Sequence, residues 1–348
     1  MLVNNVDSLF KVYLMIAAVF VLAAALTLVV RRLAARFSII DRPNDRSSHF
    51  LPTPRAGGLA IVVSSLLFVG VQAPGVPDRT LLLVLLIGGL SIATIGFLDD
   101  LDAVSVSVRF AVHAVAAMCA AIALDGLPSL PIGDGQLHLG VVGYGLAAVA
   151  IVWVLNLFNF MDGIDGIAAS EAAFITAFGA WFLWLSGDIG PVFSVSLVVS
   201  AAALGFLIWN WPPAKIFMGD VGSGYLGYVI AVLALAAAHE NSVMIFVWLI
   251  LGGVFFVDAT VTLIRRLLRG EKVYQAHRSH AYQWLARRWG SHLRVTLLVW
   301  AVNLFWLLPF AWLCTRYPEY ALVFVGVALG PLVPLALVAG AGRAEKRD

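Results

Sequence analysis

Residues 140–166 read GVVGYGLAAVAIVWVLNLFNFMDGIDG. No charged residue occurs in this stretch before Asp162, and a helix needs about 20 mostly apolar residues to cross the hydrocarbon core of a bilayer. Apolar runs of this kind recur along the chain with short polar gaps between them. The pattern predicts a helical membrane protein whose polar residues gather where the helices end.

The composition supports a membrane protein. Of the 348 residues, 61% are hydrophobic and 12% are charged, whereas soluble domains have about 25% charged residues. The apolar runs leave no room for a separate soluble domain, so we expect residues 1–348 to form a single all-α, polytopic transmembrane domain. The first run has no small-residue cleavage site after it, so we interpret it as a retained span.

We predict eleven membrane-spanning helices. They are expected near residues 10–30, 57–73, 80–98, 108–125, 140–158, 167–186, 191–210, 222–238, 243–264, 294–313 and 320–340. Between two of these spans, the Gly- and Pro-rich segment 125–139 is expected to form a small hairpin at the membrane surface.

The basic residues predict the orientation of the helices. Of the 22 lysines and arginines, all but Lys11, Arg79 and Arg316 fall on one side of the predicted spans. Because basic loops stay in the cytoplasm, we expect the N-terminus outside the cell and the C-terminus in the cytoplasm. Loops 31–56 and 265–293 are then cytoplasmic.

Five carboxylates are predicted to lie at the cytoplasmic face: Asp99, Asp100, Asp162, Asp165 and Asp220. Charged groups at membrane helix ends are costly unless they are paired, hydrated or bound to a cation. Together with the basic loops, they indicate a divalent cation and an anionic substrate in a cytoplasmic cleft.

Asp99 and Asp100 end one predicted span. Two adjacent carboxylates repel each other, so one pKa should rise unless a cation neutralises the pair, and a raised pKa suits a general base. A solvated helix end is the alternative interpretation.

Asn156, Asn159, Asp162 and Asp165 repeat at three-residue spacing, which places them on one face of a helix. This polar stripe on an apolar helix suggests a substrate site, and a hydrogen-bonded seam between helices is the alternative. Asp220 lies among glycines in Met218-Gly-Asp220-Val-Gly-Ser-Gly224. Magnesium typically uses one or two carboxylates with substrate phosphates, which this stretch fits, although a turn with a capping aspartate also would.

Two cytoplasmic loops carry further candidates. His277, Arg278 and His280 suit anion binding better than a zinc site, because no cysteine or acidic cluster completes the ligand set. Attraction of this loop to anionic lipid is the alternative. The loop at residues 41–56, before Gly57 and Gly58, is either a flap over a phosphate site or a plain connector.

Taken in order, the motifs resemble those of the polyprenyl-phosphate N-acetylhexosamine-1-phosphate transferases, which include the peptidoglycan lipid I translocase and the initiating transferases of O-antigen and common antigen. The matching stretches are Pro54-Arg-Ala-Gly57-Gly58, Gly96-Phe-Leu-Asp99-Asp100, Asn156-Leu-Phe-Asn159-Phe-Met-Asp162-Gly-Ile-Asp165-Gly166, Asn210-Trp-Pro-Pro-Ala-Lys-Ile-Phe217-Met-Gly-Asp220 and His277-Arg-Ser-His280. The family usually has a denser histidine cluster, and Ser279 departs from it. This block looks most like the subgroup that starts O-antigen-type polysaccharides.

The resemblance implies transfer of a sugar-1-phosphate from a UDP-N-acetylhexosamine to undecaprenyl phosphate, with Mg²⁺ or alternatively Mn²⁺ as cofactor. It places the enzyme in a bacterial inner membrane, in contact with lipid, without a nucleic-acid partner. The resemblance allows a homodimer without requiring one.

The resemblance also implies residue roles. Asp220 and Asp162 would bind the metal, and Asp99 or Asp100 would orient or deprotonate the acceptor phosphate. Phe217 would stack on uracil. The catalytic set further includes Asp165, His277 and His280, and substrate binding includes Asn156, Asn159, Asn210, Arg278, Gly57 and Gly58. The alternative class, an anion transporter or channel, predicts acids spread through the bilayer or an internal repeat.

Overall fold

The structure is a computed structural model that describes residues 2–43, 51–72, 79–133, 135–272 and 277–344, with the side chains from residue 12 onward. Residues 44–50 of the predicted flap and 273–276 of the loop 265–293 lie outside the described residues. The described chain is mainly helical, with two short antiparallel strand pairs.

The helices follow one another along the chain. They are α1 (Leu2–Arg36), α2 (Leu59–Gln72), α3 (Thr80–Leu101), α4 (Val106–Ala123), α5 (Val141–Met161), α6 (Ile167–Ser186), α7 (Pro191–Asn210), α8 (Asp220–Glu240), α9 (Met244–Leu251), α10 (Gly253–Leu268), α11 (Ala281–Trp289), α12 (His292–Val302), η2 (Asn303–Leu307), α13 (Leu308–Arg316), η3 (Pro318–Tyr320), α14 (Ala321–Leu329) and α15 (Leu332–Ala339). The strands are β1 (Ile40–Asp41), β2 (Thr53–Pro54), β3 (Leu130–Ile132) and β4 (Gly135–Leu137).

The prediction of an all-α polytopic membrane protein is confirmed. Within the described residues, nine helical stretches are long and apolar enough to cross a membrane. The stretch from α12 to α13 counts as one of these, and so does the stretch from η3 to α15.

The two remaining predicted spans differ from expectation. The helix predicted at 57–73 is the 14-residue α2, which is shorter than a bilayer crossing requires. The span predicted as one helix at 243–264 is instead α9 and α10, which meet at Gly252 with a bend of 72°. Glycine has low helix propensity, so the helix breaks where Gly252 and Gly253 adjoin.

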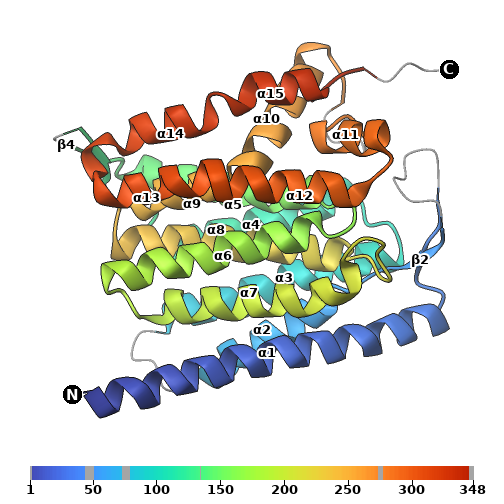
Figure 1. Cartoon of the computed structure of the whole chain (residues 1–348), viewed down its shortest axis with the longest axis horizontal. Coiled ribbons are helices and arrows are strands. Elements are labelled where there is room, and N and C mark those ends of the chain that lie inside the picture. The colour runs from blue at the N-terminus through green and yellow to red at the C-terminus, as the bar shows by residue number, and fades with distance from the viewer. Residues whose placement is uncertain (1, 44–50, 73–78, 134, 273–276, 345–348) are drawn as a thin grey trace.

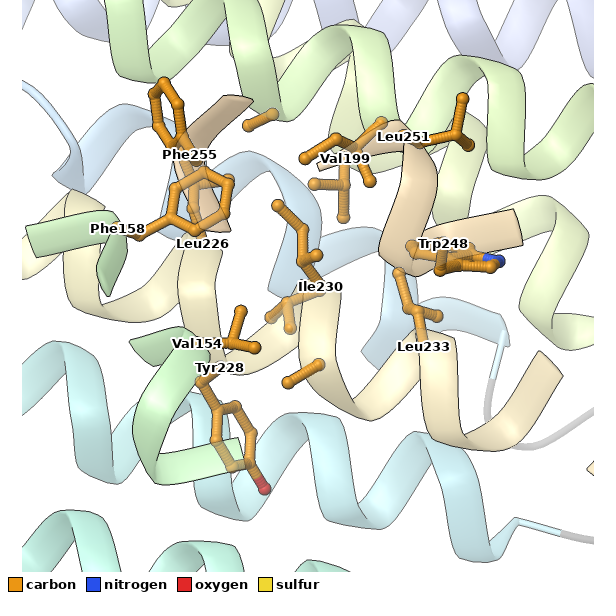
Figure 2. Packing of buried hydrophobic residues seen from close by; sticks show 14 of the residues in the cluster. Val154, Phe158, Val199, Leu226, Tyr228, Ile230, Leu233, Trp248, Leu251 and Phe255 are labelled. Carbon is orange, nitrogen blue, oxygen red and sulfur yellow. The ribbon is translucent and has the colours of Figure 1, made fainter. Parts of the chain in front are cut away.

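Helix α8 forms the centre of the bundle and packs against α3 and α5. Almost all residues of α8 are buried, and most of them are small or apolar. Figure 2 shows part of this core, where the rings of Phe158 on α5 and Phe255 on α10 lie 5.3 Å apart beside Leu226 of α8. The Tyr228 hydroxyl donates to the Val84 carbonyl of α3 at 3.1 Å.

The long helices run nearly side by side, so the connections gather at two ends of the molecule (Figure 1). One end carries β2, α11 and the C-terminus, and the other carries β4 and the N-terminus. The predicted hairpin in segment 125–139 is present as β3 and β4. Strands β1 and β2 pair across the first long loop and bring Arg55 to the α11 end.

Candidate active site

The carboxylates predicted to form a site come from three separate elements. Asp99 and Asp100 lie in the last turn of α3, Asp162 and Asp165 follow α5, and Asp220 begins α8. Because α3 and α5 both pack against α8 and end where α8 begins, the three elements bring these side chains together.

Asp100 fixes the start of α8. Its carboxylate accepts hydrogen bonds from the backbone N–H groups of Asp220, at 3.0 Å, and Val221, at 3.2 Å. Arg55 on the segment after β2 lies 2.5 Å from the same carboxylate, whose side chain is 0% exposed. Asp100 is therefore a buried cap that sets the position of Asp220.

Asp220 lies between two arginines. Arg55 is 3.7 Å from one carboxylate oxygen and Arg109 of α4 is 3.1 Å from the other. Arg109 also lies 2.6 Å from Asp99, whose second oxygen accepts from the Val104 N–H at 2.7 Å. Neither arginine was among the predicted site residues. Arg55 lies within a matched motif and was detectable there, whereas Arg109 had only its charge as a signal.

A small polar pocket of about 130 Å³ lies beside Asp220. Its lining residues include Asp41, Arg55, Asn159, Asp162, Asp165, Asn210, Phe217, Asp220, Ser223 and His292. The structure therefore brings Asp162, Asp165, Asp220, Asn159, Asn210 and Phe217 around one cavity, as the motifs predicted.

The carboxylate of Asp162 faces the pocket without a salt-bridge partner among the described residues. Among the described residues its side chain makes no hydrogen bond or ion pair. Burial raises the pKa of Asp162 well above its usual range; Asp220 and Asp100 add to the rise, while Arg55 opposes it. The pocket therefore has an unbalanced negative charge that a cation would neutralise.

The residues present fit a magnesium ion held jointly with substrate. Within the described parts of the chain no cluster of three His, Cys, Asp or Glu side chains forms a ready-made metal cage. Mg²⁺ commonly binds through one or two carboxylates, substrate phosphates and water. Asp220 and Asp162, which line the same pocket, supply such a pair.

The asparagines differ in what they contact. Asn210 is buried, accepts from the Gly166 N–H at 3.0 Å and donates to the Ile216 carbonyl at 2.9 Å. Asn159 donates to the Ser223 hydroxyl at 3.2 Å, and Asn156 donates to the Val152 carbonyl at 2.7 Å. The Asn210 contacts shape the pocket wall, and Asn159 joins the end of α5 to α8.

An apolar groove of about 350 Å³ meets the polar pocket. It is lined by residues of α3, α4, α5, α8 and α10, among them Phe110, His113, Val149, Asn156 and Phe160. Of the residues lining the two cavities, Asn159 and Asp220 are shared. Phe110 is 58% and Val149 67% exposed, so the groove reaches the apolar surface of the molecule.

The predicted histidine motif is packed against the end of α5. His280 is 1% exposed, and its ring stacks on His277 and on Phe160, with centroids 4.9 and 6.3 Å apart. Asp258 of α10 accepts from the N–H groups of Ala281 and Tyr282, at 2.8 and 3.0 Å. His277, Arg278 and His280 are not among the lining residues of the polar pocket or the apolar groove.

Gly57 and Gly58 also lie outside the two cavities and serve close packing. A Cβ atom on Gly58 would fall 2.3 Å from the Cα atom of Gly222 in α8. One on Gly57 would fall 2.7 Å from the ring of Phe206. The glycines let the start of α2 approach the start of α8, where Asp220 lies.

Comparison with known proteins identifies the class. The model of glycosyl transferase family 4 matches residues 82–238, a range that contains all five carboxylates. The "Probable undecaprenyl-phosphate N-acetylglucosaminyl 1-phosphate transferase" of Bacillus subtilis is 33% identical, over 80% of this chain and 78% of the relative.

Two other relatives have related names. The "Decaprenyl-phosphate N-acetylglucosaminephosphotransferase" of Mycobacterium tuberculosis is 31% identical, over 78% of this chain and 74% of the relative. The "Phospho-N-acetylmuramoyl-pentapeptide-transferase" of Geobacillus kaustophilus is 31% identical, over 72% of this chain and 81% of the relative.

The chain belongs to glycosyl transferase family 4, among the polyprenyl-phosphate N-acetylhexosamine-1-phosphate transferases. It is an integral membrane transferase, and the alternative of an anion transporter or channel is set aside.

Proposed function

We propose that this protein transfers N-acetylhexosamine-1-phosphate from a UDP-N-acetylhexosamine to undecaprenyl phosphate. The products are UMP and an undecaprenyl-diphosphate-linked sugar, which begins synthesis of a cell-surface polysaccharide. The observation that carries the proposal is the junction at Asp220, where a polar pocket and an apolar groove meet. A soluble donor and a lipid acceptor need such a pair of adjoining sites.

The polar pocket suits the donor. Phe217 offers an aromatic face for the uracil ring, and Arg55 offers a guanidinium for phosphate oxygens. Asp220 and Asp162 would hold Mg²⁺ or Mn²⁺, which would neutralise the diphosphate charge and stabilise the leaving UMP.

The apolar groove suits the isoprenoid chain of the acceptor. Its wall residues Phe110, Val149 and Trp153 are apolar, and Arg109 lies at the end next to Asp220. Arg109 would bind the acceptor phosphate, and Asp99 would hold Arg109 in place through the 2.6 Å contact. The two anionic phosphates could then approach each other between Arg55 and Arg109.

We further propose that residues 1–348 act as one transferase domain in a bacterial inner membrane, with the site facing the cytoplasm. The supporting observation is the position of Asp99, Asp162 and Asp220 at the same end of the bundle as α11 and its basic residues.

An assay with purified protein tests the function directly. Radiolabelled UDP-N-acetylhexosamine, undecaprenyl phosphate and Mg²⁺ should yield label that is extractable into organic solvent. Excess EDTA and the Asp220→Asn variant should each abolish the product. Full turnover in EDTA would disprove the metal assignment, and absence of product across a panel of UDP-sugars would contradict the proposed reaction.

A further inference from the structure

His292 lines the polar pocket although it lies outside every matched motif. It is the first residue of α12, and its side chain is 18% exposed. The Ser291 hydroxyl before it accepts a hydrogen bond from the Arg294 N–H at 3.3 Å. This cap fixes where α12 begins and therefore where the His292 ring enters the pocket.

The ring contacts Asp165. Its Nδ1 atom lies 3.2 Å from the Asp165 Oδ1 atom and 3.4 Å from the Asp165 amide nitrogen. The Asp165 N–H donates to the Nδ1 atom, which is therefore the acceptor nitrogen of the ring, with the carboxylate oxygen alongside it.

Two more hydrogen bonds hold the same residue. One turn along α12, the Thr296 hydroxyl donates to the Asp165 carbonyl at 3.1 Å. The Ala214 N–H, on the segment after α7, donates to the other Asp165 carboxylate oxygen at 3.0 Å. Asp165 is therefore clamped between α12 and the segment that leads to Phe217.

The location of His292 assigns it to the donor side. It lines the polar pocket with Phe217 and Asn210, and it is not a lining residue of the apolar groove. A substitution at His292 should therefore affect binding of the nucleotide donor more than binding of the lipid acceptor.

We propose that His292 is a positioning residue for the donor: together with Thr296 it holds the Asp165 backbone, and this orients the Asp165 carboxylate for hydrogen bonding to the uridine nucleotide. This inference rests on the proposed function and adds to it a residue on α12, which the motifs do not include. It acts through Asp165, so it should influence donor binding more than the rate of the bound complex.

Two substitutions separate positioning from simple packing. The side-chain oxygen of asparagine reaches about the place of the imidazole Nδ1 atom and can accept from the Asp165 N–H, whereas a glutamine amide corresponds to Nε2. His292→Asn should therefore keep the Asp165 contact and stay within about 3-fold of the wild-type donor KM. His292→Gln and His292→Ala should raise the donor KM about 5–10-fold, as expected for loss of a hydrogen bond to a backbone N–H, with the acceptor KM changed less than about 3-fold.

His239→Ala provides a matched control. The His239 Nε2 atom contacts the Gly126 carbonyl at 2.8 Å near the C-terminal end of α8, away from the pocket. This variant should leave the donor KM unchanged. Equal losses in the Asn and Gln variants, or equal rises in the donor and acceptor KM, would overturn the positioning role.

Calorimetric measurement of UMP binding in the presence of Mg²⁺ tests the proposed function and the role of His292 separately. If the wild type does not bind UMP, the proposed function fails and this inference fails with it. If the wild type binds UMP and His292→Ala binds it equally well, only the His292 inference is wrong. If the Ala variant does not fold, the Gln variant decides the matter, because it should lose UMP affinity while the Asn variant keeps nearly wild-type affinity.

Discussion

Asp99 and Asp100 are neighbours in sequence with different surroundings. The Asp100 side chain is fully buried against Arg55 and the first amides of α8. The Asp99 side chain is 12% exposed and contacts Arg109. Asp100 therefore holds the start of α8 in place, while Asp99 holds Arg109.

The two aspartates should respond differently to neutral substitution. Asp100→Asn weakens a buried ion pair and should cost about 3–5 kcal/mol of unfolding free energy. Asp99→Asn should cost about 1 kcal/mol or less, because Arg109 keeps its contact with Asp220. Thermal unfolding in detergent measures both variants. Equal loss of stability in the two variants would show that the contacts of Asp100 stabilise the fold no more than those of Asp99.

The raised pKa of Asp162 predicts a pH-dependent stability. The folded state disfavours the charged form of Asp162, so ionising this carboxyl destabilises the folded protein. This destabilisation is absent below the ordinary aspartate pKa of about 3.9, grows as the pH rises, and is complete above the raised pKa. In EDTA at pH 8, Asp162→Asn should therefore melt several degrees above the wild type, and the gap should close as the pH falls.

Added Mg²⁺ should also narrow that gap, since a bound cation favours the charged carboxylate. Melting curves across pH 4–8, with and without Mg²⁺, provide the measurement. A gap that is constant with pH would rule out the charge of Asp162 as its cause.

At the level of elements, α6 and the stretch from α12 to η2 are joined by a buried polar pair. The Glu171 Oε2 atom accepts from the Asn303 amide at 2.6 Å, and both residues are 0% exposed. The remaining oxygens, Glu171 Oε1 and Asn303 Oδ1, have no hydrogen-bond partner among the described residues. Asn303 starts the π-helical turn η2 on the same helical stretch as His292.

Removing one member of this pair should cost more than removing both. Glu171→Ala leaves the Asn303 amide unpaired and creates a cavity, which together should cost about 2–5 kcal/mol. Glu171→Gln should be tolerated, because an amide can both donate to and accept from Asn303. A double-mutant cycle of Glu171→Leu and Asn303→Leu, followed by thermal unfolding, should give a coupling energy of about 1–3 kcal/mol. Additive effects would contradict the pairing.

At the scale of the whole molecule, each end of the bundle has an exposed residue that can report its orientation in the membrane. Arg288 of α11 is exposed at the end that carries the site, and Gln136 of β4 is exposed at the opposite end. The helices that connect these ends are long enough to span a bilayer. The basic-residue distribution predicts that the α11 end faces the cytoplasm.

Cysteine labelling tests this orientation. In a chain with Cys119 and Cys314 replaced, an impermeant reagent should label Gln136→Cys in intact cells and Arg288→Cys only after permeabilisation. Both positions suit labelling because their side chains are exposed. Labelling of Arg288→Cys in intact cells would reverse the predicted topology.

The membrane class, most of the helices and the pocket carboxylates were predictable from local sequence. A bilayer requires long apolar runs, so the spans are visible along the chain without knowledge of packing. The bend at Gly252 and the short α2 were not predicted: the Gly252-Gly253 pair lowers helix propensity without showing that the helix bends there, and the apolar run at 57–73 does not show where α2 begins and ends. One cavity is lined by residues from several of the motifs, because each motif lies where a helix begins or ends. These residues are Asp162, Asp165, Asn159, Asn210 and Phe217.

Local sequence patterns were enough to predict which residues gather at one end of the molecule. The contacts of each residue depend on the folded chain: Asp100 caps a helix that starts 120 residues later, and His292 contacts Asp165 from 127 residues away. Such contacts depend on long-range packing of α3, α8 and α12, which no local pattern encodes. For the same reason the structure separated Asp99 from Asp100 and packed His280 against Phe160 instead of the pocket.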